Sequence, residues 1–182
     1  MHLIQSFELL AGTPPSIALG RASVEQVVDL LSRVETGLEK WPWENAPRTT
    51  KSAPAKWVIE NEYHVQSILY MVLAPVFPDI TLEEYPLQVG QYNPRLDIGI
   101  PNLRLIVEAK YWRRSNTAAE MIKQIGEDAS LYLAMGSRYE TLVAFIWDDV
   151  GRGDEHHRIA KGLNKVHGIG GVVIVSRPQR LV

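Results

Sequence analysis

Residues 93–111 read NPRLDIGIPNLRLIVEAKY, and this stretch decides the fold that the sequence predicts. Two apolar runs, 95–100 and 103–110, flank the dipeptide Pro101-Asn102. Such a dipeptide between two apolar runs favours a short connection between two antiparallel strands. Because side chains alternate between the faces of a strand, the position of each polar residue assigns it to one face of this hairpin.

Three charged residues of the hairpin are expected to meet. Glu108 and Lys110 lie one pleat apart on the same face of the second strand. Three apolar side chains of the first strand are expected to share a face, which leaves Asp97 on the opposite one. These three are Leu96, Ile98 and Ile100. If the two strands pair directly, Asp97 and Glu108 converge and Lys110 lies beside them.

This cluster has the composition of a phosphodiesterase site. Two converging carboxylates repel each other, and a hard divalent cation such as Mg²⁺ or Mn²⁺ relieves that repulsion. A neighbouring lysine can orient or deprotonate a water molecule and offset the charge of a phosphate. Phosphodiester hydrolysis needs a metal, a nucleophilic water and positive charge. The sequence therefore predicts a metal-dependent nuclease with Asp97, Glu108 and Lys110 at its centre.

A helix predicted over residues 56–74 can add a third carboxylate. Glu62 falls within its apolar stripe, where a lone glutamate is costly unless a group pairs with it. Glu60 falls on the polar face of the same helix. We therefore prefer Glu62 as a metal ligand or as a neighbour of one, and Gln66, one turn later, could support it.

A second helix, predicted over residues 116–134, follows the hairpin. Gln124, Asp128 and Tyr132 are spaced four residues apart, so they form one line along this helix. The line borders an apolar stripe that should face the sheet. We expect it to bring Gln124 close to the metal or to a phosphate.

The rest of the chain completes an α/β pattern. From residue 55 the predicted order is α-β-β-β-α-β-α-β, which implies a mixed sheet with helices on both faces. The further elements are strands over 81–89, 139–147 and 171–175 and a helix over 155–165. A helix over 23–40 and a linker over 45–54 precede them. We divide the chain into a helical N-terminal arm, residues 1–54, and a domain, residues 55–182.

Composition limits the classes of protein. The 182 residues contain no cysteine, which excludes disulfides and thiolate zinc sites and makes a reducing cytoplasm the expected location. Neither a signal peptide nor a membrane-spanning run is recognisable. The formal net charge is −2, so a nucleic acid would have to be held by a local basic patch. The cations proposed to hold a DNA backbone are Arg95, Arg113, Arg114 and Lys123. By themselves these charges suit a solvated face slightly better.

Two other polar pairs receive structural interpretations. His156 and His157 are neighbours on a predicted helix and cannot face one another, which favours a solvated pair over a metal site. Asp148 and Asp149 follow a strand and are interpreted as turn residues.

The motif and its context resemble the PD-(D/E)XK nuclease superfamily. Asn93-Pro-Arg-Leu-Asp97 followed by Glu108-Ala-Lys110 is similar to its signature, although Pro94 stands three residues before the aspartate instead of next to it. Segments 61–66, 107–111 and 124–128 further resemble the nuclease domain of MboI/DpnII-like restriction endonucleases, over roughly residues 57–150.

The resemblance implies a restriction-endonuclease-like fold and specific roles. Asp97, Glu108, the Ala109 carbonyl and Glu62 would bind Mg²⁺ or Mn²⁺, and Lys110 would act on the attacking water. DNA would be the substrate and defence against foreign DNA the role. A homodimer, or a partner protein bound through the arm, is compatible with this. The alternative is a non-cleaving nucleic-acid-binding or assembly module that keeps the fold.

Overall fold

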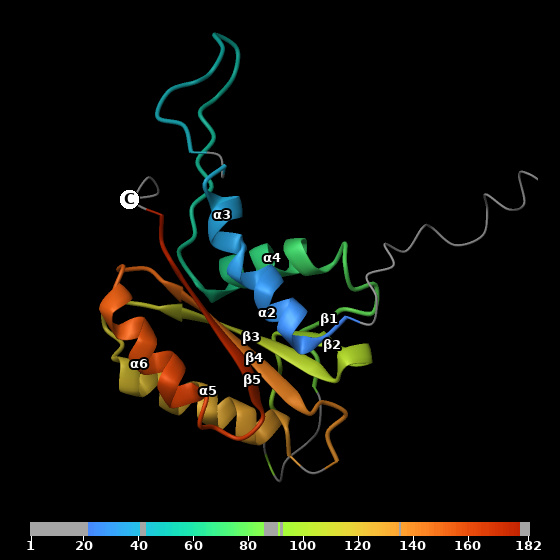
Figure 1. Cartoon of the computed structure of the whole chain (residues 1–182). Coiled ribbons are helices and arrows are strands. Elements are labelled where there is room, and N and C mark those ends of the chain that lie inside the picture. Colours follow the sequence, from blue (N-terminus) through green and yellow to red (C-terminus); the bar gives the residue numbers. More distant parts are fainter. Residues whose placement is uncertain (1–21, 41–42, 86–90, 92, 135, 179–182) are drawn as a thin grey trace, which may run out of the picture.

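The computed structural model describes residues 22–40, 43–85, 91, 93–134 and 136–178. Within them, five strands form one mixed sheet in the order β1-β2-β3-β4-β5 (Figure 1). The strands are β1 (Thr81–Leu82), β2 (Ile98–Ile100), β3 (Leu105–Trp112), β4 (Thr141–Asp148) and β5 (Ile169–Ser176). β1, β2 and β3 pair antiparallel, whereas β3, β4 and β5 pair parallel. The predicted mixed sheet with flanking helices is confirmed.

Helices cover both faces of this sheet (Figure 1). They are α2 (Val24–Ser32), α3 (Val34–Leu38), α4 (Glu62–Leu73), α5 (Ala118–Tyr132) and α6 (Gly153–Leu163). One core combines α2, α3 and α4 with the odd-numbered residues of β3, such as Val107. The other combines α5 and α6 with Ile106 of the opposite face. Each face of β3 is thus buried, as in a strand flanked by helices on both sides.

The hairpin has the predicted register. Pro101–Leu103 forms a single 3-10 turn, and Ile98 pairs with Val107 in the antiparallel ladder. One detail of the prediction is wrong. Ile98 and Ile100 face the α2–α4 core, but Leu96 belongs to the α5–α6 core. A bend at Asp97 interrupts the alternation there, so Leu96 lies on the opposite face.

Several helices and strands are shorter than predicted. α4 begins at Glu62 rather than at residue 56, because the Asn61 side chain accepts a hydrogen bond from the His64 N–H at 3.1 Å and caps the helix. The helix predicted over 23–40 is divided into α2 and α3 at Arg33. The strand predicted over 81–89 is limited to β1 among the described residues, and 86–90 lie outside them.

The N-terminal helix α2 packs directly on the sheet. Val27 and Leu31 are fully buried in the core that contains β5. The approach is close, because a Cβ atom on Gly171 would lie 2.4 Å from a methyl group of Val28. Residues 43–56 instead form an exposed loop, closed at its base by a bridge between Trp43 and Lys56 (Figure 1). The domain boundary at residue 54 stays a prediction.

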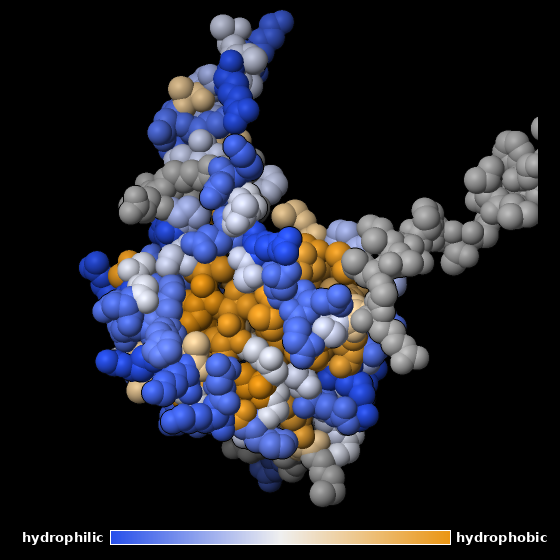
Figure 2. All heavy atoms as spheres, viewed as in Figure 1, coloured by the Kyte–Doolittle hydropathy of each residue, from blue (hydrophilic) through white to orange (hydrophobic). Residues whose placement is uncertain are grey.

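β5 forms one edge of the sheet, and its side chains are only partly covered. Figure 2 shows apolar side chains gathered over β5, between α2 and α6. Val172 and Ile174 are partly buried, whereas Val173 and Val175 face the core beneath α2. Among the described residues, no helix is long and apolar enough to cross a membrane.

Candidate active site

The hairpin places Asp97 directly against β3. The Asp97 carboxylate accepts a hydrogen bond from the Ala109 N–H at 2.8 Å through one oxygen. Its other oxygen accepts from the Gln66 side-chain amide at 2.6 Å. Gln66 therefore supports Asp97 rather than Glu62, the partner that the sequence suggested. Two fixed donors hold the Asp97 carboxylate in one orientation.

Glu108 is a buried carboxylate with a hydrogen-bond partner among the described residues for only one of its two oxygens. Its side chain is 2% exposed, and one oxygen accepts a hydrogen bond from the Lys110 ammonium at 2.6 Å. The other oxygen, Oε2, is buried and has no hydrogen-bond partner among the described residues. An unpaired buried carboxylate oxygen is costly, because it has lost its hydration without replacement. A group absent from the polypeptide is expected to satisfy it.

The two acids hold protons more tightly than carboxyl groups in water. Burial raises the pKa of Asp97 to about 6, although the Ala109 N–H and the Lys110 charge act in the opposite direction. Burial also raises the pKa of Glu108 well above its ordinary value, and the nearby Asp97 charge raises it further. A second positive charge between them would lower both pKa values. The site therefore favours the binding of a cation.

Lys110 lies between two carboxylates. Its ammonium group is 2.6 Å from a Glu108 oxygen and 2.9 Å from an Asp128 oxygen. Burial lowers the pKa of Lys110, but the charges of Glu108, Asp128 and Glu62 outweigh that effect and raise it above its ordinary value. Lys110 is thus held as a cation, and it can donate hydrogen bonds but cannot accept a proton.

Asp128 was noticed in the sequence only as part of a helical line. The structure places it on α5, where it contacts Lys110 across an 18-residue separation in sequence. Gln124, one turn earlier on the same helix, is exposed. Tyr132, one turn later, is buried and donates a hydrogen bond to the Arg95 carbonyl at 2.9 Å. The line therefore reaches the site through Asp128, and the role of Gln124 stays a prediction.

Glu62 is the first residue of α4 and is partly buried. Its charge raises the pKa values of both Asp97 and Lys110, so it lies within electrostatic range of the cluster. In the longer helix predicted over 56–74, Glu62 would lie in the helix interior, whereas the structure places it in the first turn. Because α4 starts at Glu62, its carboxylate also lies at the positive end of the helix dipole, which stabilises a negative charge. Glu60 precedes the helix and is exposed.

The four cations proposed to bind a phosphate backbone are all exposed. Arg95 pairs with Glu83 at 3.3 Å, and Lys123 pairs with Glu127 at 3.8 Å. The Arg113 guanidinium lies 5.7 Å from the centre of the Tyr111 ring. Arg114 is exposed in the turn after β3. Of the four, Arg95 lies closest in sequence to the carboxylates, and its DNA contact stays a prediction, as do those of the others.

The cluster contains ligands that suit a hard divalent cation. Among the described residues, no group of three or more His, Cys, Asp or Glu side chains has the arrangement of a complete metal site. Mg²⁺ does not require one, since it usually keeps several waters and takes one or two carboxylates. The unpaired Oε2 atom of Glu108, next to the Asp97 charge, fits such an ion. Ala109 lies between Glu108 and Lys110 in sequence and is fully buried.

A second buried anion lies at the end of β4. Asp148 is completely buried and accepts hydrogen bonds from the backbone N–H groups of Val150, Gly151 and Arg152. The Nε2 atom of His156 lies 2.8 Å from one of its oxygens. The interpretation of His156 as solvated is wrong, because the turn after β4 folds α6 back over Asp148. The interpretation of Asp148 as a turn residue is also wrong, because it is the last residue of β4 and a buried anchor for α6, whereas Asp149 lies in the bend that follows.

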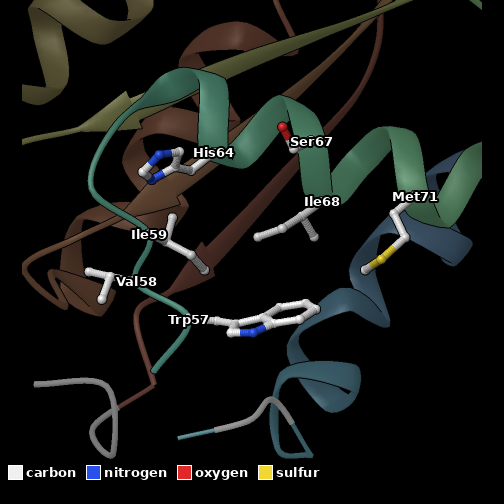
Figure 3. Close-up of a pocket in the computed structure, with 7 residues that line it drawn as sticks. All are labelled: Trp57, Val58, Ile59, His64, Ser67, Ile68 and Met71. Atoms are coloured by element: carbon white, nitrogen blue, oxygen red, sulfur yellow. The ribbon is translucent and has the colours of Figure 1, made fainter. Parts of the chain in front are cut away.

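An apolar hollow of about 280 Å³ lies on α4, away from the two carboxylates. Figure 3 shows the Trp57 ring facing Ile68 and Met71 of the helix, with Val58 and Ile59 at one side. Its lining carries no carboxylate, lysine or arginine, so it lacks the groups that hydrolysis of a phosphodiester requires.

Comparison with known proteins gives one match. The family described as REase_DpnII-MboI matches residues 32–179, which include the hairpin, α4, α5 and the whole sheet. The match begins at the end of α2. No curated protein and no solved structure matches the chain.

Proposed function

The chain belongs to the DpnII-MboI restriction endonuclease family, and from this premise we propose that Asp97, Glu108 and Lys110 hydrolyse DNA phosphodiester bonds with a divalent cation, Mg²⁺ or Mn²⁺. Members of a restriction endonuclease family cut DNA and generally use divalent metal ions. The observation that carries the proposal is the buried, unpaired Oε2 atom of Glu108 beside a second carboxylate.

In the proposed site, Asp97 and Glu108 hold the ion, and Glu62 and the Ala109 carbonyl are the further ligands. When bound, the ion activates a water molecule and stabilises the negative charge that develops on the phosphate. Gln66 and the Ala109 N–H orient Asp97 through hydrogen bonds of 2.6 and 2.8 Å. These contacts support a fixed arrangement, because outer partners orient the first ligands of a metal.

Lys110 acts as a cation in this proposal. Its contacts with Glu108 at 2.6 Å and Asp128 at 2.9 Å favour the ammonium form. As an ammonium group it can hold the attacking water by a hydrogen bond and offset the charge of the phosphate. Asp128 helps to keep it in place through a contact of 2.9 Å. The sequence left both orientation and deprotonation of the water open, and the charges around Lys110 favour orientation.

The proposal extends to biological role and assembly. Defence against foreign DNA is the role that we propose on the basis of the family. A two-fold dimer would provide one site for each DNA strand, since two symmetric sites are needed to cut both strands together. Arg95, Arg113, Arg114 and Lys123 are proposed to contact the backbone, and the N-terminal arm, residues 1–54, is proposed to bind a partner protein.

Cleavage assays test the proposal. Purified protein is incubated with linear and circular DNA in Mg²⁺, Mn²⁺ or EDTA, beside Asp97→Ala and Lys110→Ala. We expect metal-dependent cutting that both substitutions abolish, and loss of the circular substrate identifies an endonuclease. Glu62→Gln should slow cutting, whereas Glu60→Gln, two residues away and exposed, serves as the matched control.

Two results would contradict the proposal. Folded protein that cuts neither DNA nor RNA in any of the metals would favour a non-cleaving binding module. Cutting that persists in Asp97→Ala would place the active site elsewhere in the chain. Thermal unfolding of each variant shows whether a loss of cutting reflects a loss of folded protein.

A further inference from the structure

A groove of about 310 Å³ runs beside Asp97, on the side of α4 that faces β1. Its walls come from two turns of α4 and from the segment that begins with β1. The lining residues are Tyr63, Gln66, Ser67, Tyr70, Leu82 and Glu83. The apolar hollow of Figure 3 uses other residues of α4, apart from Ser67, which borders both.

Residues on two walls of this groove form hydrogen bonds with Asp97. The Gln66 side-chain amide donates to the Asp97 carboxylate at 2.6 Å. On the opposite wall, the Glu83 N–H donates to the Asp97 carbonyl at 2.9 Å. A molecule seated in the groove would therefore lie next to the carboxylate that is proposed to bind the metal. Gln66 thus lines the groove and also contacts a carboxylate of the candidate active site.

The lining exposes two aromatic rings in a row. Tyr63 is 59% exposed and Tyr70 36% exposed, and their separation of seven residues puts them on one side of α4, two turns apart. Leu82, 47% exposed, faces them across the groove. Exposed aromatic rings offer flat apolar surfaces, and nucleic acid bases stack on such surfaces without regard to sequence.

The rim carries a cation that a phosphate could recruit. Arg95 pairs with Glu83 at 3.3 Å, and both side chains are 43% exposed. Such an exposed pair contributes little stability, so Arg95 can exchange Glu83 for another anion. Glu83 also has a φ angle of 50°, in the left-handed region. Strained residues that are not glycine gather at ligand sites.

From these observations we propose that the groove binds unstacked nucleobases of the DNA strand next to the scissile phosphate, with one base on Tyr63, another on Tyr70 and the adjoining phosphate at Arg95. This inference rests on the proposed function for its substrate. A base that is still stacked in a duplex has both faces covered, so only unstacked bases can use these rings. Tyr63 and Tyr70 are thus positioning residues, since neither contacts the reacting atoms.

The test uses the full chain labelled with 3-fluorotyrosine at its seven tyrosines. Tyr63→Phe and Tyr70→Phe assign the two fluorine resonances of the groove. Measurements are made in EDTA and in the Glu108→Gln background, so that no strand is cut. The probes are a thymidine oligonucleotide of about twenty nucleotides, longer than most single-strand sites, and an abasic oligonucleotide with the same number of phosphates.

We expect the thymidine oligonucleotide to shift the Tyr63 and Tyr70 resonances upfield, as ring stacking does, and the abasic one to leave them in place. Tyr63→Leu keeps apolar bulk but removes the ring. It should weaken binding of the thymidine oligonucleotide by about tenfold more than binding of the abasic one, within the usual range for one base–aromatic stack, because loss of the Tyr63 hydrogen bond with Arg95 affects both oligonucleotides alike. Trp57→Leu, an exposed aromatic of the hollow in Figure 3, is the matched control and should change neither.

Equal shifts with both oligonucleotides, or a Tyr63→Leu variant that binds thymidine normally, would overturn the proposal. The result is separable from that of the nuclease assay. If the protein cuts DNA but shows no base-dependent shift, the base-binding role of the groove is wrong and the proposed nuclease function stands. If the protein never cuts DNA but shows the shift, the groove binds bases and the proposed nuclease function is wrong.

Discussion

Glu108 and Asp148 are buried carboxylates on neighbouring parallel strands, but the protein satisfies them differently. Asp148 accepts hydrogen bonds from three backbone N–H groups and lies 2.8 Å from His156. Glu108 accepts a hydrogen bond from Lys110, and its second oxygen has no hydrogen-bond partner among the described residues. A fully satisfied buried anion stabilises the fold around it, whereas an unsatisfied one indicates a missing ligand. We therefore interpret Asp148 as a structural carboxylate and propose Glu108 as a functional one.

The largest expected effect is on cutting by Glu108→Gln. The amide keeps the size of the side chain but removes the charge that the ion requires. We expect kcat to fall by about 10³-fold or more, as when a member of a catalytic group is lost, with little change in thermal stability. Asp148→Asn should leave kcat unchanged in the protein that remains folded. Single-turnover cleavage measures the rates of both variants. Equal losses of activity in Glu108→Gln and Asp148→Asn would contradict the different roles assigned to the two carboxylates.

Asp148→Ala should reduce the stability of the fold, in contrast to Glu108→Gln, which should reduce the rate of cutting. It leaves three backbone N–H groups and His156 without their acceptor. We expect the free energy of unfolding to fall by about 3 kcal/mol, as for other buried charges whose partner is removed. Urea denaturation measures it. Asp149→Asn, the next residue, whose pair with Arg177 is partly exposed, is the control and should cost less than about 1 kcal/mol. A similar loss in both variants would contradict the anchoring role.

The stability of the protein should depend on pH through the ionisation of the buried Asp97 carboxyl group. The pKa of Asp97 is raised from 3.8 to about 6, so its stabilising contribution is complete below about pH 4 and is lost as the pH rises to about 6. Asp97→Asn removes this ionisation. Without metal, the variant should exceed the wild type in unfolding free energy at pH 7 by about 3 kcal/mol and show no such advantage at pH 4.

Thermal and urea unfolding in EDTA at both pH values provide the measurement. Mg²⁺ should reduce the difference at pH 7, because binding to the native wild type stabilises it by mass action. An advantage of Asp97→Asn that is equal at both pH values would mean that the ionisation of Asp97 is not its source.

The smallest effect is expected from Asp128→Asn. Lys110 loses one of its two charged partners but keeps Glu108. We expect kcat to fall about tenfold, the lower range for a residue that orients a catalytic group, while KM changes little. Glu127→Gln, the exposed neighbour on α5, should leave both constants unchanged. A rise in KM without a fall in kcat would assign Asp128 to substrate binding instead.

The hairpin shows how much of the site was predictable. Its connection, its antiparallel register and the convergence of Asp97 with Glu108 follow from local pattern, because alternation along a strand is fixed by the backbone. The error at Leu96 arose where a bend ended the alternation. α4 was predicted too long, since the apolar spacing continued past the residue, Asn61, that caps it.

The sequence by itself determined the α/β order and the face of β3 that carries Glu108 and Lys110. Only the tertiary structure decided that Gln66 holds Asp97, that Asp128 holds Lys110 and that His156 contacts Asp148. It also decided that α2 packs on β5. The physical reason is that strand and helix periodicities act between near neighbours in the chain. Contacts between elements depend on how whole helices pack on the sheet, which no local pattern specifies.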